Sequence, residues 1–552
     1  MGRHFLSRAD LARGTAQRRS RAARPFRGFL TAILCALAFA GCVPGSQEAG
    51  PGAKVAQTLV LAAGHELGAA NPHDYGSNMA LLDLLYEPLV RYGPDGSPVP
   101  ALAVSWGSTP DGLTWTFTLR PQVTFHDGTP FDAAAVKWNF DRWLGAPAHG
   151  WLPLTERITK VETPDARTVA LTLRQAYYPI LQELSVIRPV RFLSPRAVDG
   201  HGVFAQPCGT GPWKMASLAE RRAVLVRNEA YWGAKPQIHG VVVEVILDAQ
   251  TRVAALQSGE IQMIGGEYLG TIPPESLATL QADPALAVLT GSSVTSLHLM
   301  TQYIKPPFDD VRVRRALNLA IDRQGIVQAI FGGRAEAATG VMASAIPYVT
   351  RTATDLYHFN PSQARSLLAE AGWRPDARGV LVKDGQPLQM ELGVDRSRLP
   401  ETVSIAEAIQ AQVQAIGIDL KLRLYDYSGW LQAYRSRHFA LLMSFTWGPP
   451  YDPHTLLHGS FRSAPAPDAM PAYTDAQLDG LIDAALASTD VPTRHTLYQR
   501  IWQYMDDQAV VIPLVSPHRL YAHRSSVTGL RLGGTEYDLA YALQQVVIRG
   551  KK

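Results

Sequence analysis

The chain contains few cysteines, and this scarcity limits how the fold can be held together. Only three occur in 552 residues: Cys35, Cys42 and Cys208. The first two lie within an N-terminal export signal or at its end, so Cys208 would remain alone in the exported protein. An internal disulfide is therefore excluded, and a chain of this length can bury enough apolar surface to fold without one.

A strong charge bias is also missing. The 52 lysines and arginines nearly balance the 48 aspartates and glutamates. The net charge of +4 has a local origin, because residues 1–28 hold eight arginines and one aspartate, a net +7. Without that segment the net charge would be −3, the difference between +4 and +7. The sequence therefore predicts no nucleic-acid partner.

Long apolar runs are missing too, except for a short one near the N-terminus. Residues 28–42, GFLTAILCALAFAGC, follow the arginine-rich segment. This run is too short to span a bilayer, which takes about 20 residues. A basic segment, a short apolar stretch and small residues before a cut site are typical of a secretory signal. We expect residues 1–41 to be that signal and residues 42–56 to be a flexible tether.

The end of this segment indicates where the exported protein is held. Ala40-Gly41-Cys42 resembles a bacterial lipobox, in which the cysteine is lipidated and becomes the new N-terminus. Phe39 stands where such motifs usually have leucine, and ordinary cleavage near Ala40 is the alternative. With a lipid on Cys42, the protein is expected in the periplasm or on the outer face of the cytoplasmic membrane.

Common sequence signatures of enzymes are not found. The chain has no HExxH zinc motif, no P-loop and no G-x-S-x-G nucleophile elbow. Cys208 lies between Pro207 and Gly209, where a turn indicates a structural role. The sequence therefore predicts that the protein is not an enzyme. It also predicts no covalent cofactor apart from the lipid on Cys42.

What the sequence does contain is an alternation of strand and helix patterns. Strands are predicted at 58–63, 113–119, 167–173, 240–247, 418–424 and 509–514. Helices are predicted at 79–90, 133–144, 249–258, 309–329, 361–371, 405–416, 474–487 and 491–507. The predicted fold class is therefore α/β. No Pro/Ser-rich linker divides residues 58–552, which favours two lobes joined by short hinges.

Several longer motifs resemble one protein family. They are residues 100–140, GTGPW (209–213), RNEAYWGAKP (227–236) and VRVRRALNLAID (311–322). In this order they resemble the peptide/nickel-type solute-binding proteins of ABC importers, known as family 5, over nearly all of 58–552. Three further segments are most similar to the nickel-binding NikA type. These are YEPLVRYGPDGS (86–97), AYYPILQELSVIRPVRF (176–192) and TWGPPYDPH (446–454).

The resemblance implies a type II periplasmic-binding-protein fold with a discontinuous first lobe. Lobe I would comprise residues 57–297, with an extra subdomain at about 98–210, and lobe II residues 298–518. Residues 519–552 would return to lobe I. The lobes would close on a ligand by hinge motion. The protein, expected to be a monomer, would then deliver the ligand to separate permease and ATPase subunits.

The resemblance also implies a ligand and the residues that hold it. The ligand would be nickel(II), or a related metal, as a chelate with histidine or a metallophore. Arg188 matches the family's arginine that meets the chelator's carboxylates, a role that suits a planar guanidinium. Trp151 and Trp447 match the two tryptophans that flank the ligand. Further matches in the cleft are Tyr451, Met79, Tyr75 and Thr535.

The sequence departs from the family where a protein side chain would touch the metal. Pro465 stands where the family's best-known member has a metal-binding histidine, and Ala148 where it has a second arginine. His149, His454 and His458 are the nearby candidates for metal ligands. The last two are four residues apart and can share a helix face. Two histidines are a poor metal site without a third ligand, so a structural role is the alternative.

Three hypotheses about the ligand and the function stay open at this point. The chelator can supply all the donor atoms, and the metal chelate then needs no protein histidine. The same fold can instead bind a di- or oligopeptide. A non-transport role, as a sensor or a chaperone module, is the third hypothesis.

Overall fold

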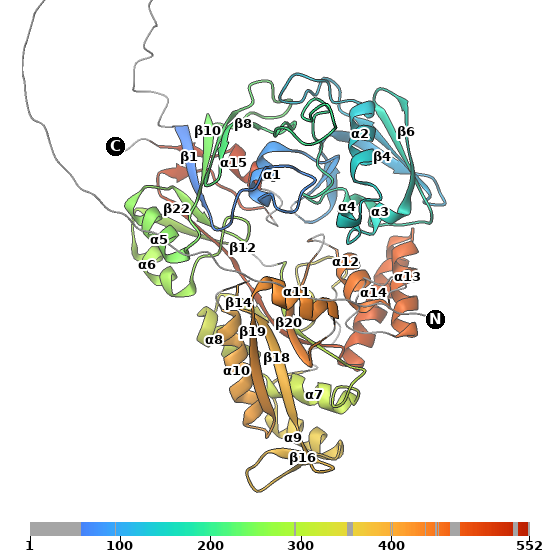
Figure 1. Cartoon of the computed structure of the whole chain (residues 1–552), viewed down its shortest axis with the longest axis vertical. Helices are drawn as coiled ribbons and strands as arrows, with labels where there is room; N and C mark the ends of the chain where they lie inside the picture. The colour runs from blue at the N-terminus through green and yellow to red at the C-terminus, as the bar shows by residue number, and fades with distance from the viewer. Residues whose placement is uncertain are drawn as a thin grey trace, which may run out of the picture. The chain divides into compact units, whose positions relative to one another are not determined.

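The computed structural model has mixed α/β architecture, as predicted (Figure 1). It describes residues 57–549 except 94, 292–293, 350–356, 398, 400, 437, 448–449, 451, 464–474 and 534–538. The expected signal and tether, with Cys42, lie outside the described residues. So do two candidate cleft residues, Tyr451 and Thr535.

Strands from both ends of the chain form a seven-stranded sheet. Across the sheet the order is β12 (Leu286–Gly291), β22 (Arg519–Arg524), β11 (Met263–Gly265), β1 (Thr58–Ala63), β10 (Gly240–Val245), β9 (Arg222–Arg227) and β8 (Trp213–Ala219). β1 runs parallel to β10 and β11, whereas β22 is antiparallel to β11 and β12. β22 therefore brings the last part of the chain back to the sheet that contains β1.

Helices and a small sheet complete this part of the molecule. The helices are α1 (Met79–Leu85), α2 (Ala133–Trp143), α3 (Leu154–Arg157), α4 (Ile180–Glu183), α5 (Ala249–Ser258), α6 (Leu277–Ala282) and α15 (Leu539–Gln544). The small sheet has the order β4 (Ala103–Ser108), β5 (Thr114–Leu119), β7 (Thr168–Leu173) and β6 (Ile158–Asp165). Strand β5 alternates, because Phe117 and Leu119 are buried whereas Thr116 is exposed and Thr118 is half-buried.

The middle of the chain forms a six-stranded sheet. Its order is β14 (Ala335–Ala337), β21 (Val511–Pro517), β13 (Leu297–Thr301), β20 (Leu441–Phe445), β18 (Gln389–Asp395) and β19 (Asp419–Tyr425). Its helices are α7 (Val311–Ala320), α8 (Arg323–Phe331), α9 (Pro361–Glu370), α10 (Thr402–Gln414), α11 (Tyr427–Ser436), α12 (His454–Leu456), α13 (Ala476–Ala487) and α14 (Val491–Asp507). The chain passes from one sheet to the other between β12 and β13, and again between β21 and β22.

Short strand pairs and turns of helix join these elements. The strands are β2 (Val90–Tyr92) with β3 (Pro98–Pro100), β15 (Arg374–Pro375) with β16 (Leu381–Lys383) and β17 (Gln386–Pro387), and β23 (Val527–Thr528) with β24 (Val547–Ile548). The turns are the 3₁₀-helices η2 (Pro147–His149) and η3 (Pro274–Ser276) and the π-helical turn η4 (Leu457–Phe461).

Two predicted helices differ from the observed ones. The helix predicted at 309–329 is two helices, because Asp322 has a non-helical backbone and its side chain accepts from the Gly325 N–H. Asp322 therefore caps the second helix, α8. The helix predicted at 79–90 ends at Leu85, before Pro88. The other helix predictions agree with the structure to within three residues at each end.

The buried apolar residues show that α13 and α14 do not pack only with the six-stranded sheet. Leu478, Ile482 and Ile501 from these helices belong to the same core as Leu59 and Phe117. The backbone N–H of Tyr178 also donates to the carbonyl of Leu486, at 3.1 Å. A separate core lies between the six-stranded sheet and its helices α7 and α10. The lobe boundaries given above stay a prediction.

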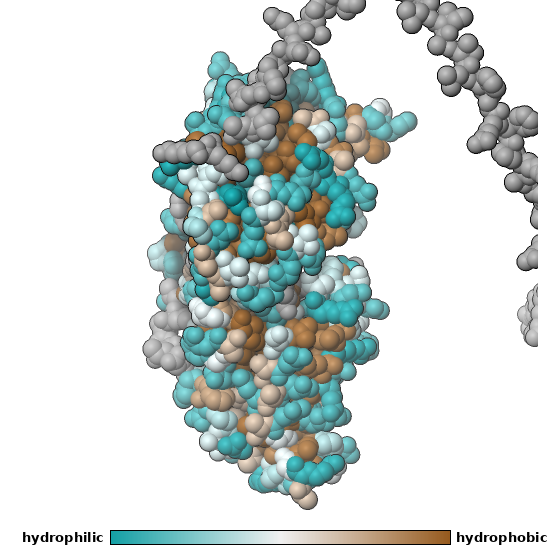
Figure 2. Space-filling model, turned by 90° about the vertical axis from the view of Figure 1, so that its left-hand side faces the viewer, coloured by the Kyte–Doolittle hydropathy of each residue, from teal (hydrophilic) through white to brown (hydrophobic). Residues whose placement is uncertain are grey.

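The surface carries hydrophobic side chains in separate patches. Figure 2 shows such patches among polar residues on one face of the molecule. In the part of the chain that the structure describes, no helix is long and apolar enough to cross a membrane.

Candidate ligand cleft

Arg188 fixes the loop that precedes α1. Its Nη1 donates to the carbonyl oxygens of Tyr75, at 2.5 Å, and of Ser77, at 3.1 Å. The guanidinium also lies over the Tyr75 ring, 4.9 Å from the ring centroid. Asn78 then caps α1 by accepting from the Leu81 N–H. A half-buried arginine is thus held in one orientation by a loop from another part of the chain.

The Tyr75 hydroxyl joins two further candidate residues. It accepts a hydrogen bond from Trp151 Nε1 and lies 3.0 Å from His149 Nδ1. Burial lowers the pKa of His149 and raises the pKa of Tyr75, so both groups are neutral at pH 7. Tyr75 can therefore donate its hydroxyl proton to His149. This pairing explains why His149 is almost fully buried without a charge partner.

Trp447 completes an aromatic wall. Its ring meets that of Trp151 edge to face, with the centroids 6.4 Å apart. It follows β20, whereas Trp151 follows the short 3₁₀-helix η2, so the wall is built from distant parts of the chain. We call Arg188, Tyr75, His149, Trp151 and Trp447 the aromatic corner. The structure thus brings together four of the seven predicted ligand-binding residues and one of the three predicted metal ligands.

The Trp447 ring packs directly against Gly459. A substitution at this glycine tests whether the position of Trp447 matters for ligand binding. A Cβ atom at Gly459 would lie 2.5 Å from Cη2 of the Trp447 ring. Gly459→Ala should therefore push the indole out of the wall and weaken ligand binding about 10-fold, which corresponds to about 1.4 kcal/mol. The matched control is Gly480→Ala in α13, where a Cβ meets nothing within 4 Å. Unchanged affinity in Gly459→Ala would show that the Trp447 position is not needed.

Met79 follows Ser77, a partner of Arg188, by two residues. It is the first residue of α1, is half-buried and packs against the core. The described contacts do not join its side chain to Arg188 or to the tryptophans.

His454 lies in a buried network with two acidic side chains. The side chain is fully buried; its Nε2 is 2.8 Å from Glu183 Oε1, and its Nδ1 is 2.8 Å from Asp452 Oδ1. Burial alone would lower the pKa of His454, but the two carboxylates outweigh this effect and raise the pKa to about 9. Both ring nitrogens are therefore occupied, and a metal could reach neither without breaking the network. This geometry gives His454 a structural role.

His458 does not join His454 in a metal site. The two share one helical segment, but burial and the nearby Arg157 and Arg462 lower the pKa of His458 to about 4. Among the described residues, no group of three or more His, Cys, Asp or Glu side chains is placed to hold a metal ion.

Glu183 and Asp452 were not predicted as partners of His454. Glu183 lies in an apolar segment, where its carboxylate also accepts from the Leu154 N–H at 2.7 Å and from the Tyr177 hydroxyl. A buried acid in apolar surroundings requires hydrogen-bond or ion-pair partners. This rule predicts that Glu183 has partners, but it does not say which residues they are.

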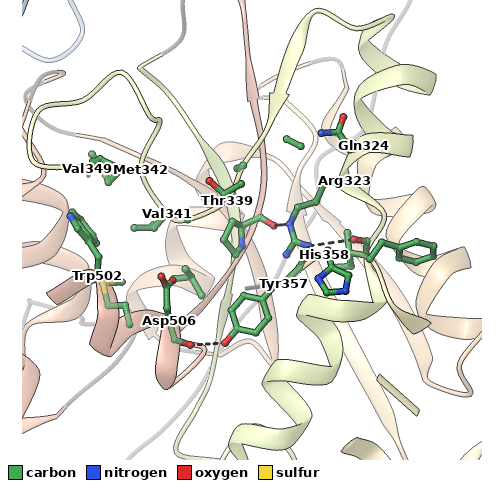
Figure 3. Close-up of a pocket in the computed structure, with 18 of the residues that line it drawn as sticks. Arg323, Gln324, Thr339, Val341, Met342, Val349, Tyr357, His358, Trp502 and Asp506 are labelled. Carbon is green, nitrogen blue, oxygen red and sulfur yellow. Dashed lines mark hydrogen bonds between the residues drawn. The ribbon is translucent and has the colours of Figure 1, made fainter. Parts of the chain in front are cut away.

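A separate cavity of about 260 Å³ lies beside the six-stranded sheet (Figure 3). Arg323 is one of its lining residues, and Figure 3 shows its guanidinium beside Tyr357, whose carbonyl oxygen accepts from Arg323 Nη1 at 3.2 Å. Its Nε donates to the Pro513 carbonyl at 2.6 Å, and its Nη2 donates to Asn318 Oδ1 at 2.8 Å. Burial lowers the pKa of Arg323 to about 10. Arg323 therefore has a structural role, because its hydrogen bonds join β21 to α7.

The chain has a type II periplasmic-binding-protein fold, in which two sheets are connected by two crossing segments. Aromatic side chains and an arginine from distant loops meet in it. A model of the bacterial extracellular solute-binding proteins, family 5 Middle, matches residues 97–468. The chain belongs to this family, and it is the solute-binding component of an ABC importer. Proteins of this family bind small ligands and work with permease and ATPase subunits; they are not enzymes.

Three known proteins show the likeness in detail. The nickel-binding periplasmic protein of Escherichia coli K12 is 36% identical over 467 residues, 81% of this chain and 87% of its own. The glutathione-binding protein GsiB of Salmonella paratyphi A is 30% identical over 498 residues, 86% and 92% respectively. The crystal structure of NikA from Brucella suis in complex with Fe(III)-EDTA is 32% identical with a TM-score of 0.82. It covers 89% of this chain and 100% of that one.

Proposed function

We propose that the protein captures a chelate of nickel, or of a related transition metal, between its two lobes and delivers it to the importer's permease. The observation that carries this proposal is Arg188, held at an aromatic corner by Tyr75 and Ser77. The similarity to a nickel-binding protein and to a protein solved with Fe(III)-EDTA supports it.

The chemistry of the corner suits a chelate with carboxylate groups. A guanidinium forms charge-assisted hydrogen bonds with carboxylates, and its orientation is already fixed by the loop. The two indole rings offer flat apolar surfaces for the organic part of the chelator. We place Tyr451, Met79 and Thr535 in the same cleft as further contacts. The metal donors would come chiefly from the chelator, with His149 as the candidate protein ligand.

A titration followed by tryptophan fluorescence tests the proposal, because Trp151 and Trp447 form the wall. Nickel with free L-histidine and nickel with a synthetic polycarboxylate should each give a saturable change. Nickel alone and the chelators alone should give a much weaker one. The proposal fails if no metal chelate changes the fluorescence.

A peptide ligand is the second candidate, favoured by the similarity to GsiB. Glutathione, a tripeptide with two carboxylates, also offers a partner for Arg188. A melting experiment distinguishes the two candidates. The cognate ligand should raise the melting temperature, and the rise should grow with the logarithm of its concentration once this exceeds the dissociation constant. Glutathione and dipeptides are one arm, and metal chelates are the other.

We also propose that Cys42 is lipidated and tethers the protein to the outer face of the cytoplasmic membrane. The motif Ala40-Gly41-Cys42 supports this. The mature protein should carry a mass increment at Cys42, and Cys42→Ala should release it into the soluble fraction. An unmodified N-terminus near residue 41 would show ordinary cleavage instead.

A further inference from the structure

His149 lies in the aromatic corner with one ring nitrogen still available. Its Nδ1 is 3.0 Å from the Tyr75 hydroxyl, whereas its Nε2 has no hydrogen-bond partner among the described residues. Nε2 is also not one of the fully enclosed side-chain atoms that lack a partner. Although the residue as a whole is only 4% exposed, this atom therefore keeps accessible surface.

The Tyr75 hydroxyl determines where the proton of the His149 ring lies. This hydroxyl accepts a hydrogen bond from Trp151 Nε1 and has His149 Nδ1 as its other described partner. An indole N–H can only donate, so Trp151 leaves the hydroxyl proton available for a second hydrogen bond. His149 Nδ1 is the only described acceptor within reach of that proton. Tyr75 therefore donates to Nδ1, and the neutral ring carries its proton on Nε2.

The opposite tautomer fits this set of contacts less well. With a proton on Nδ1, both Trp151 and His149 would donate to the Tyr75 oxygen. The hydroxyl proton would then have no acceptor among the described residues. The doubly protonated ring is disfavoured as well, because burial lowers the pKa of His149. The neutral ring with its proton on Nε2 is the form that satisfies all three side chains.

A proton on Nε2 decides what this nitrogen can bind. A metal ion needs the lone pair of a ring nitrogen, and a metal-bound histidine almost always donates its other N–H to an acceptor. His149 has the reverse arrangement, because its Nδ1 accepts from a hydroxyl. An Nε2–H group instead donates to oxygen acceptors such as carboxylates. The preceding bonds from Trp151 to Tyr75 and from Tyr75 to His149 polarise the ring and strengthen this donor.

We infer that His149 donates its Nε2–H to a carboxylate of the bound chelate and does not ligate the metal. The inference rests on the proposed function and reassigns His149 within it, from candidate metal ligand to hydrogen-bond donor. The Arg188 guanidinium and the His149 ring lie 4.9 Å and 5.4 Å from the centroid of the Tyr75 ring. One charged and one neutral donor thus surround the same tyrosine. This arrangement favours a chelator with more than one carboxylate that fills the coordination sphere of the metal by itself.

¹⁵N NMR of the histidine-labelled natural protein tests the tautomer without any ligand. A ring nitrogen with a proton and one with a lone pair have well-separated chemical shifts, and His149→Gln identifies the His149 signals by their loss. We expect the proton on Nε2. A proton on Nδ1 would overturn the inference, whatever the ligand is.

Fluorescence titration with nickel chelates tests the contact with the ligand. The glutamine side chain reaches about as far as Nε2 and keeps an N–H donor. His149→Gln should therefore bind nickel with a hexadentate polyaminocarboxylate within about three-fold of the natural protein, whereas His149→Leu should bind it about ten-fold more weakly. The exposed His201, changed to leucine, is the control and should have no effect. A loss in His149→Leu that occurs only with a tetradentate chelator, which leaves positions on nickel open, would overturn the inference.

The same complex with Cu(II) in place of nickel gives a spectroscopic readout. An imidazole bound to copper produces a characteristic nitrogen modulation in pulsed EPR, and we expect identical spectra from the natural protein and His149→Gln. A modulation that His149→Gln removes would overturn the inference and leave the proposed function standing. If the natural protein binds no metal chelate at all, the proposed function fails, and this contact fails with it.

Discussion

Replacing His454 with alanine should lower the free energy of unfolding by about 3–5 kcal/mol, the cost of breaking a buried ion pair. The reason is that Glu183 and Asp452 would remain buried with their shared cation removed. The helices α13 and α14 should loosen with it, because Tyr178 links Asp452 to Tyr498 in α14. Chemical denaturation of the two proteins at pH 7 measures this difference.

His458→Ala is the matched control. His458 lies four residues further along, and its pKa of about 4 keeps it neutral at pH 7. This substitution should lower the free energy of unfolding by no more than about 1 kcal/mol, because it leaves no buried charge without a partner. Equal losses in the two variants would contradict the role given to the His454 network.

The same network predicts how stability depends on pH. The pKa of His454 in the folded protein, about 9, is above its ordinary value of 6.5. The stability from the charged ring is therefore complete below pH 6.5 and is lost as the pH rises through 9. The advantage of the natural protein over His454→Gln should shrink across that window.

Replacing Arg188 with alanine should weaken binding of the metal chelate about 30-fold, or ~2 kcal/mol, the worth of hydrogen bonds to a charged group. Part of this effect comes from the loss of the hydrogen bonds by which Arg188 holds the loop at Tyr75 and Ser77. Arg188→Lys keeps the positive charge but loses the planar guanidinium. Its affinity for the chelate should therefore lie between those of the natural protein and Arg188→Ala. The fluorescence titration described above measures all three proteins.

Arg196→Ala is the control for this prediction, because Arg196 is exposed on the segment that follows. It should bind the chelate as the natural protein does. If Arg188→Ala binds equally well, the aromatic corner is not the ligand site.

The pattern of the sequence predicted the alternating elements well, because these depend on local spacing. Strand β1 and helix α5 have the predicted bounds, and Gly259 ends α5 with a left-handed backbone. The break at Asp322 was missed because the apolar spacing continues across it. The sharing of one core by α13, α14 and the seven-stranded sheet depends on contacts far apart in the chain. No local pattern contains that information.

The candidate site was likewise predicted in part. The resemblance supplied Arg188, Trp151 and Trp447, and the structure places them on neighbouring loops. The role of Tyr75 as the residue that joins Arg188, His149 and Trp151 could not be predicted, because it depends on the exact fit of three loops. His454 and His458 share a helical segment as expected, but the carboxylates that hold His454 come from two different segments.

Native mass spectrometry of the exported protein as purified, combined with metal analysis, tests the central claim most directly. The account predicts a bound species whose mass equals one transition-metal ion, nickel foremost, together with a chelator that carries carboxylates. Arg188→Ala should lose this species. A bound peptide without metal would contradict the account.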